Sequence, residues 1–295
     1  MIGILVAAIF LAQAPQPDGA GVRPGVLPKR WITGGPNCIE VPDWQVHEYN
    51  PDFYILRESG CTHYEKPFLY LLFGKDKALL EDTGAGKADT ARVVEDLIGK
   101  WLKRNQRQSI PLIVAHSHSH GDHTSGDRQF QGLANITMVP LSVDGTAQFY
   151  GVEKWPRTTG RLDLGDRVID VIPIPGHDRV SIALYDRQTG VLLTGDSLYP
   201  GRLYVPVAEF GTFVESTQRL VDFTDGKIVT HVLGTHIEQT STPYLDYPVG
   251  SSYQPEEHVL ELSRGHLLEL NDALRKMGGN PARLALRDFT IWPKK

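Results

Sequence analysis

The segment 114–123 constrains this chain more than any other. It reads VAHSHSHGDH, so that His118, His120, Asp122 and His123 follow directly after an apolar run. In an extended segment side chains alternate between two faces, so His118 and His120 point the same way and can hold one cation. Asp122 and His123 come where the chain turns away and can reach a second cation. We therefore predict a metal site at a strand end; the alternative is a polar loop with solvated histidines.

Three later segments end in further metal-ligand residue types. An apolar run over 171–177 leads into Gly176 and His177, a second over 191–197 contains Gly195 and Asp196, and a third over 228–236 ends in His236. With the first motif and in this order, they resemble the metallo-β-lactamase-fold hydrolases over roughly residues 50 to 240. His231 is the competing histidine in the third segment, and Gly does not follow His236.

This resemblance implies a division of the ligands between two metals. The first metal is expected on His118, His120 and His177, and the second on Asp122, His123 and His236, with Asp196 bridging them. Asp82, in an Asp-Thr-Gly sequence that is also similar to the family, is expected to support the metal loop. Mixed imidazole and carboxylate donors favour Zn²⁺, with iron or manganese as alternatives.

The resemblance also implies a reaction. Two cations about 3.5–4 Å apart lower the pKa of a shared water to about 7, which makes hydroxide available at neutral pH. That hydroxide would attack a substrate carbonyl, while Asp122 orients it and later passes a proton to the leaving group. We thus expect a zinc-dependent hydrolase, with two zinc ions per chain, acting on a small substrate of the β-lactam, lactone or thioester class.

Other functions stay open within the same fold. One is a metal-binding protein without turnover, against which the presence of Asp122 argues; another is a phosphoesterase. Oxygen-reducing di-iron relatives carry Glu where His120 stands, so this chain does not match them. The sequence Asp196-Ser197-Leu198 followed by Pro200 is similar to the third subclass of metallo-β-lactamases, but this similarity does not decide the substrate.

The charge pattern narrows the class of partner. The net charge is −5 and the sequence has no dense block of Lys and Arg, so nucleic acid is not the expected substrate. After the first residues, no apolar segment reaches the roughly 20 residues that span a bilayer. We expect a small-molecule substrate and no membrane span, and the sequence leaves the oligomeric state open.

The N-terminal region predicts an exported chain. Residues 1–14 form a short apolar run that ends in Ala-Gln-Ala, which is typical of a cleaved signal peptide, although no Lys or Arg precedes the run. We predict that residues 15–50, which are rich in Pro and Gly, form an extension on the surface, that 51–295 form the metallo-β-lactamase-fold domain, and that the protein is secreted or periplasmic. Cys38 and Cys61 are the only cysteines, and export permits a disulfide between them.

Hydrophobic periodicity predicts an α/β fold, an αββα sandwich. An amphipathic helix over 93–102 separates two groups of short apolar strands, and later helices are expected on the other outer face. We expect His116 at a strand end beside the metal ligands, and His47, His63, His258 and His266 at the surface or hydrogen-bonded in the core. The predicted strands cover 53–56, 68–73, 78–80, 111–115, 136–140, 168–174, 181–185 and 191–193, and the other predicted helices cover 142–150, 213–223 and 257–274.

Overall fold

The computed structural model describes residues 21–35 and 37–295. The predicted signal peptide, residues 1–14, lies outside the described residues. In the part that is described, no helix is both long and apolar enough to cross a lipid bilayer.

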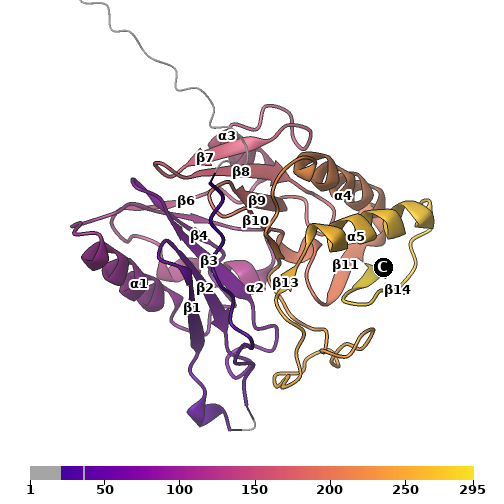
Figure 1. The fold of residues 1–295 in the computed structure, drawn as a ribbon, viewed down its shortest axis with the longest axis horizontal. Helices are drawn as coiled ribbons and strands as arrows, with labels where there is room; N and C mark the ends of the chain where they lie inside the picture. The colour runs from indigo at the N-terminus through magenta and orange to yellow at the C-terminus, as the bar shows by residue number, and fades with distance from the viewer. Residues whose placement is uncertain (1–20, 36) are drawn as a thin grey trace, which may run out of the picture.

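Two six-stranded sheets form the middle of the molecule, and a three-stranded sheet lies at one side (Figure 1). The first sheet has the order β1 (Trp44–Asn50), β2 (Phe53–Glu58), β3 (Phe68–Phe73), β4 (Ala78–Glu81), β5 (Leu112–Ala115), β6 (Ile136–Met138). The second has the order β13 (Glu261–Leu262), β12 (His231–Leu233), β10 (Val191–Leu193), β9 (Ile182–Asp186), β8 (Val168–Pro173), β7 (Gly160–Asp163). The third has the order β11 (Arg202–Pro206), β15 (Thr290–Lys294), β14 (Leu284–Ala285).

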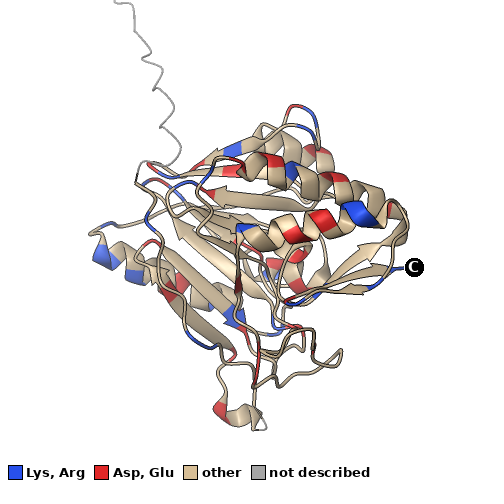
Figure 2. Cartoon of the chain, turned by 45° about the vertical axis from the view of Figure 1, so that its right-hand side comes forward, with Lys and Arg blue, Asp and Glu red and all other residues tan. Residues whose placement is uncertain are grey.

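Helices cover the outer faces of the two large sheets (Figure 1). On one side lies α1 (Thr90–Arg104), which begins at an Asp89 cap whose carboxylate accepts from the Arg92 N–H at 3.2 Å. On the other side α4 (Phe210–Thr224) and α5 (Arg264–Met277) lie side by side, with acidic and basic side chains on both (Figure 2). The shorter helices are α2 (Gly121–Thr124) and α3 (Val143–Tyr150).

Strand β3 shows why the sheets pack as layers. All six of its residues are buried and apolar, because both faces of the sheet are covered. Phe68 and Leu72 belong to the core between the two sheets, whereas Leu69 and Leu71 pack in the cluster under α1. Alternate residues of β9 and β10 divide in the same way between the central core and the cluster under α4 and α5. The predicted αββα sandwich is confirmed.

Several details differ from the sequence prediction, among them strands β7 and β13, which lie outside the predicted strands. The first sheet begins earlier than expected, at β1 (Trp44–Asn50). This edge strand is half-exposed and its buried residues do not alternate, so the sequence pattern did not indicate it. The last helix begins at Arg264 rather than at 257, since Ser263 caps it and its N–H donates to His266 Nδ1 at 3.0 Å. The third sheet was not predicted, since two of its strands are the short C-terminal segments β14 and β15.

A disulfide joins Cys38 to Cys61, with the two Cα atoms 5.5 Å apart. The crosslink that the sequence permitted is therefore present in the structure. It ties the segment before β1 to the loop after β2, and that loop leads to Glu65 and Lys66 beside the metal ligands.

The core between the sheets should dominate stability. Leu184 of β9 is 1% exposed and packs in that core. We expect Leu184→Ala to lower the free energy of unfolding by about 2–5 kcal/mol, because it leaves a cavity between the sheets. Urea denaturation followed by circular dichroism measures this change. Leu268→Ala on α5, where the leucine is 40% exposed, is the control and should stay within about 0.5 kcal/mol of the wild type; equal losses would contradict this account of the core.

Candidate metal centre

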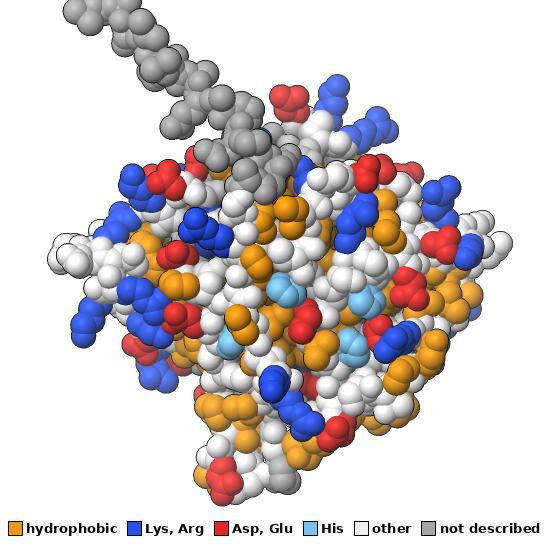
Figure 3. Space-filling view, viewed as in Figure 1, with side chains coloured by type: hydrophobic (Ala, Val, Ile, Leu, Met, Phe, Trp, Pro, Cys, Tyr) orange, Lys and Arg blue, Asp and Glu red, His pale blue; other side chains and the backbone are white. Residues whose placement is uncertain are grey.

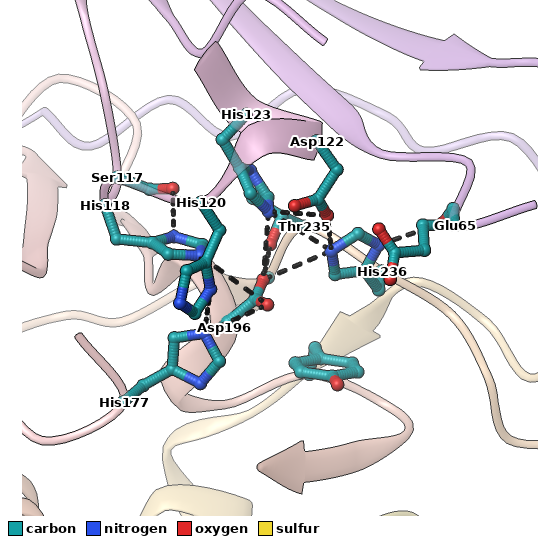
Figure 4. A network of polar contacts seen from close by, with 12 residues as sticks. Glu65, Ser117, His118, His120, Asp122, His123, His177, Asp196, Thr235 and His236 are labelled. Atoms are coloured by element: carbon teal, nitrogen blue, oxygen red, sulfur yellow. Dashed lines mark hydrogen bonds and ion pairs between the residues drawn. The ribbon is translucent and has the colours of Figure 1, made fainter. Parts of the chain in front are cut away.

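All seven predicted ligands lie at one edge of the sandwich, where strands end (Figure 4). After β5 the chain runs through His118 and His120 into α2, which carries Asp122 and His123. His177 follows β8, Asp196 lies in the short 3₁₀ helix Gly195–Ser197 after β10, and His236 follows β12. Loops that leave a rigid sheet at one edge bring side chains from distant parts of the sequence together.

The ligands form two groups that share an aspartate. His118, His120 and His177 gather with Asp196, and Asp122, His123 and His236 form the second group; within each, the ligand atoms lie within 4.8 Å of one another. Asp196 Oδ2 lies 3.4 Å from His177 Nε2 and 3.8 Å from His118 Nε2. Its Oδ1 lies 3.3 Å from His236 Nε2 and 3.6 Å from His123 Nε2. One carboxylate oxygen therefore faces each group, as a bridging position requires.

Hydrogen bonds on the far side of the rings set the histidine tautomers. His177 Nδ1 lies 2.7 Å from the Tyr204 carbonyl and His236 Nδ1 lies 2.9 Å from the Glu65 carbonyl. A carbonyl only accepts, so each Nδ1 carries the proton and donates. In the neutral ring, Nε2 then presents a lone pair toward the centre. This is the arrangement in which a protein holds a histidine as a metal ligand.

The facing nitrogens fit a cation. His236 Nε2 lies 3.3 Å from His123 Nε2, and His177 Nε2 lies 3.0 Å from His120 Nδ1. In the His123–His236 pair each Nδ1 donates to an oxygen, so the two Nε2 atoms present lone pairs that cannot hydrogen-bond to each other, and a proton or a metal ion fits between them. Asp122 Oδ2, at 3.1 Å from His123 Nε2 and 3.2 Å from His236 Nε2, supplies matching negative charge. Nitrogen and oxygen donors of this kind suit zinc.

Electrostatics hold the carboxylates ionised. Burial alone would raise the pKa of Asp196, but the imidazoles of His236, His118 and His123 outweigh burial and keep that pKa well below its usual range. Burial lowers the pKa of both His118 and His177, which favours their neutral, ligating form. The first group thus combines neutral imidazoles with an ionised carboxylate, which is what metal binding needs.

Asp82 holds the segment that carries the first four candidate ligands, through hydrogen bonds to Ser117 and His123. Its Oδ1 accepts from the Ser117 N–H at 2.8 Å, and its Oδ2 accepts from Ser117 Oγ at 2.8 Å and lies 2.8 Å from His123 Nδ1. Asp82 has a φ of 68°, a left-handed conformation that Asp adopts more readily than most residues. The structure therefore places it where the sequence resemblance expected it.

Five of the candidate metal ligands form one wall of a cavity of about 350 Å³: His120, Asp122, His177, Asp196 and His236. Lys66 lines this cavity and is 2% exposed; its ammonium donates to the Ser251 carbonyl at 2.8 Å, and burial lowers its pKa to about 8. Tyrosines, a valine and prolines also line the cavity, so that its wall is partly apolar. These residues are Tyr64, Tyr199, Tyr204, Val205, Pro206 and Pro248.

The remaining histidines have other partners. His116 Nε2 lies 2.8 Å from Asp127 Oδ1, outside both ligand groups, and His231 Nδ1 lies 2.9 Å from the Tyr49 hydroxyl. His258 and His266 both contact Asp288, at 3.1 and 3.0 Å. Sequence reasoning missed the two backbone carbonyls that orient His177 and His236, because a carbonyl partner leaves no residue-type signal.

Comparison with known proteins identifies the family. A family model for the metallo-beta-lactamase superfamily matches residues 67–236, and the chain belongs to that superfamily. Among solved structures, the metallo-beta-lactamase from Pontibacter korlensis superimposes with a TM-score of 0.51 and 20% identity, covering 79% of this chain and 99% of that one. The metallo-beta-lactamase fold expected from the sequence is thus confirmed.

Among curated proteins, the chain is similar to an acyl-coenzyme A thioesterase and to a hydroxyacylglutathione hydrolase. The chain is 26% identical to the acyl-coenzyme A thioesterase MBLAC2 of Gallus gallus over 246 residues, which are 72% of this chain and 87% of the relative. It is 29% identical to a hydroxyacylglutathione hydrolase of Nostoc punctiforme over 106 residues, which are 34% of this chain and 41% of that relative.

The support from Asp82 can be tested by metal affinity. Asp82→Asn keeps the backbone conformation accessible but removes the charge that holds the His123 ring. We expect the affinity for zinc to fall by about 10–100-fold, as measured by competition with a chromogenic chelator. Asp288→Asn removes an aspartate that also contacts two histidines, but away from the centre, and should leave the affinity unchanged. Equal affinities in wild type and Asp82→Asn would contradict the role of Asp82.

Proposed function

We propose that this chain is a zinc-dependent hydrolase of acyl thioesters, with two zinc ions per chain. The observation that carries the proposal is Asp196, whose two oxygens face separate groups of ligands at the wall of one cavity. The first metal would lie on His118, His120 and His177, and the second on Asp122, His123 and His236. Bound there, the cations supply a Lewis acid and a water that ionises near neutral pH.

Asp122 is the proposed catalytic residue. It lies on the cavity wall, and its Oδ2 is held between His123 and His236 at 3.1 and 3.2 Å. From this position its carboxylate accepts a hydrogen bond from the attacking water and orients the oxygen toward the substrate carbonyl carbon. The C–S bond then breaks, the acyl group gains the water oxygen, and the proton passes through the Asp122 carboxylate to the thiolate.

Two considerations favour a thioester over a lactam or lactone. The relatives that match most of the chain are named acyl-coenzyme A thioesterases, whereas the metallo-beta-lactamase structures are similar in fold alone. A thiol has an ordinary pKa of about 8.5, so it leaves as an anion with little help from an acid.

Export is part of the proposal. The disulfide between Cys38 and Cys61 supports a secreted or periplasmic location, because such bonds persist in oxidising compartments.

The surface charge bears on the kind of substrate. Basic and acidic side chains are interspersed on the face drawn in Figure 3, which fits a small-molecule substrate better than a polyanion.

The metal assignment predicts a stoichiometry. Protein purified with zinc should contain two zinc ions per chain by inductively coupled plasma mass spectrometry. His236→Ala removes one side chain of the second group and should lower the content to about one per chain. His231→Ala is the matched control, since this histidine contacts Tyr49 instead, and it should keep two. Two firmly bound zinc ions in His236→Ala would reject His236 as a ligand.

The reaction is tested with a panel of substrates on the zinc-loaded enzyme. We expect acyl-coenzyme A thioesters to be hydrolysed with kcat/KM at least about 100-fold above that for nitrocefin, acyl-homoserine lactones or bis-p-nitrophenyl phosphate, a difference of about 2.7 kcal/mol in transition-state binding. Asp122→Ala should abolish thioester turnover while much of the first metal stays bound. Preferential hydrolysis of nitrocefin would show a lactamase, and unchanged turnover in Asp122→Ala would remove that residue from the mechanism.

A further inference from the structure

The third sheet turns one face toward the cavity and away from the core. Leu203, Val205 and Ile291 of this sheet are buried in the cluster under α4 and α5. Because side chains alternate along a strand, Tyr204 of β11 and Trp292 of β15 point to the opposite face. They are direct cross-strand partners, both are half-buried, and their ring centroids are 5.8 Å apart.

A cation lies over each of these two rings. Lys294 Nζ is 3.5 Å from the centroid of the Tyr204 ring, and Arg283 Cζ is 3.6 Å from the centroid of the Trp292 ring. Both cationic side chains are exposed, and within residues 21–35 and 37–295 neither forms an ion pair with a carboxylate. We call Tyr204, Arg283, Trp292 and Lys294 the aromatic–basic face. It has two positive charges available for an anionic ligand.

The aromatic–basic face is continuous with the metal cavity. Tyr204 and Lys294 both line that cavity, and the Tyr204 carbonyl accepts from His177 Nδ1 at 2.7 Å. Arg202, in contrast, is neutralised by Glu238 at 2.6 Å and by Asp246 at 2.8 Å. Its Nε donates to the Tyr204 hydroxyl at 2.9 Å, which fixes the ring in place. A long substrate whose reacting group lies at the candidate metal ligands would therefore extend along this face where it emerges from the cavity.

We propose that the aromatic–basic face binds the phosphorylated nucleotide part of a coenzyme A thioester. This inference rests on the proposed thioesterase function and names its thiol carrier. Phosphates would pair with Lys294 and Arg283 and draw these exposed side chains off the two rings, and the base would stack against the uncovered Tyr204–Trp292 pair. A glutathione thioester has carboxylates for the cations but no aromatic base for the rings, so the face favours a nucleotide carrier.

The test compares two substrates with the same acyl group. Acyl-coenzyme A carries the nucleotide, and the matching acyl-pantetheine lacks it. We expect Trp292→Ala and Arg283→Gln each to raise KM for acyl-coenzyme A by about tenfold, as the loss of one stacking or charged contact would, with kcat nearly unchanged. Neither variant should change KM for acyl-pantetheine. Lys276→Gln, on the remote surface of α5, is the control and should change neither substrate.

Outcomes separate this inference from the proposed function. Thioester turnover with the same KM for acyl-coenzyme A in wild type, Trp292→Ala and Arg283→Gln would overturn the aromatic–basic face and leave the thioesterase standing. Binding of adenosine 3′,5′-bisphosphate, measured by calorimetry, provides a readout without turnover. If no thioester is hydrolysed but the bisphosphate binds wild type and not Trp292→Ala, the nucleotide site stands and the thioesterase fails. Absence of both turnover and binding overturns both.

Discussion

Burial of both faces of the two central sheets is the constraint on which the rest of the structure depends. With α1 on one outer face, α4 and α5 on the other, and a shared core between the sheets, the strand interiors are closed to solvent. A polar side chain there bears a large desolvation cost. The edge where the strands end is left for chemistry. All seven candidate metal ligands lie there, on loops whose starting points the packed sheets hold in place.

In the candidate metal centre, both backbone carbonyls and a side-chain carboxylate orient the histidine rings. The carbonyls of Glu65 and Tyr204 orient His236 and His177, and the Asp82 carboxylate orients His123. Tyr204 has two roles, since its carbonyl holds a candidate ligand while its ring begins the aromatic–basic face. A change in the path of β11 would therefore alter both the metal centre and the proposed nucleotide contact.

Much of this arrangement could be predicted from the sequence, and the physical reasons are specific. The H-x-H-x-D-H segment predicts four candidate ligands, because His118 and His120 alternate toward one side and Asp122 and His123 follow directly where the chain turns into α2. His177, Asp196 and His236 each follow an apolar strand, and their order along the chain identified them only through a family resemblance. Strands buried on both faces, such as β3, are apparent as continuous apolar runs.

Other features could not be predicted. The buried residues of edge strand β1 do not alternate, β14 has only two residues, and β15 contains Pro293, a residue that is rare inside strands. The helix α5 begins at a Ser263 cap in which His266 takes the place of the usual Glu or Gln, so the common capping pattern is missing. The pairing of Tyr204 with Trp292 depends on the register between β11 and β15, and register is a property of the folded sheet.

The Cys38–Cys61 crosslink has a consequence for how the enzyme matures. It closes a loop of 23 residues and anchors the segment that leads to Glu65, whose carbonyl positions the last histidine. Oxidation of the two thiols removes conformations from the unfolded chain in which that carbonyl is far from the sheet edge. Under the proposed function, thiol oxidation during folding therefore favours the position of His236 in which this histidine would hold the second metal.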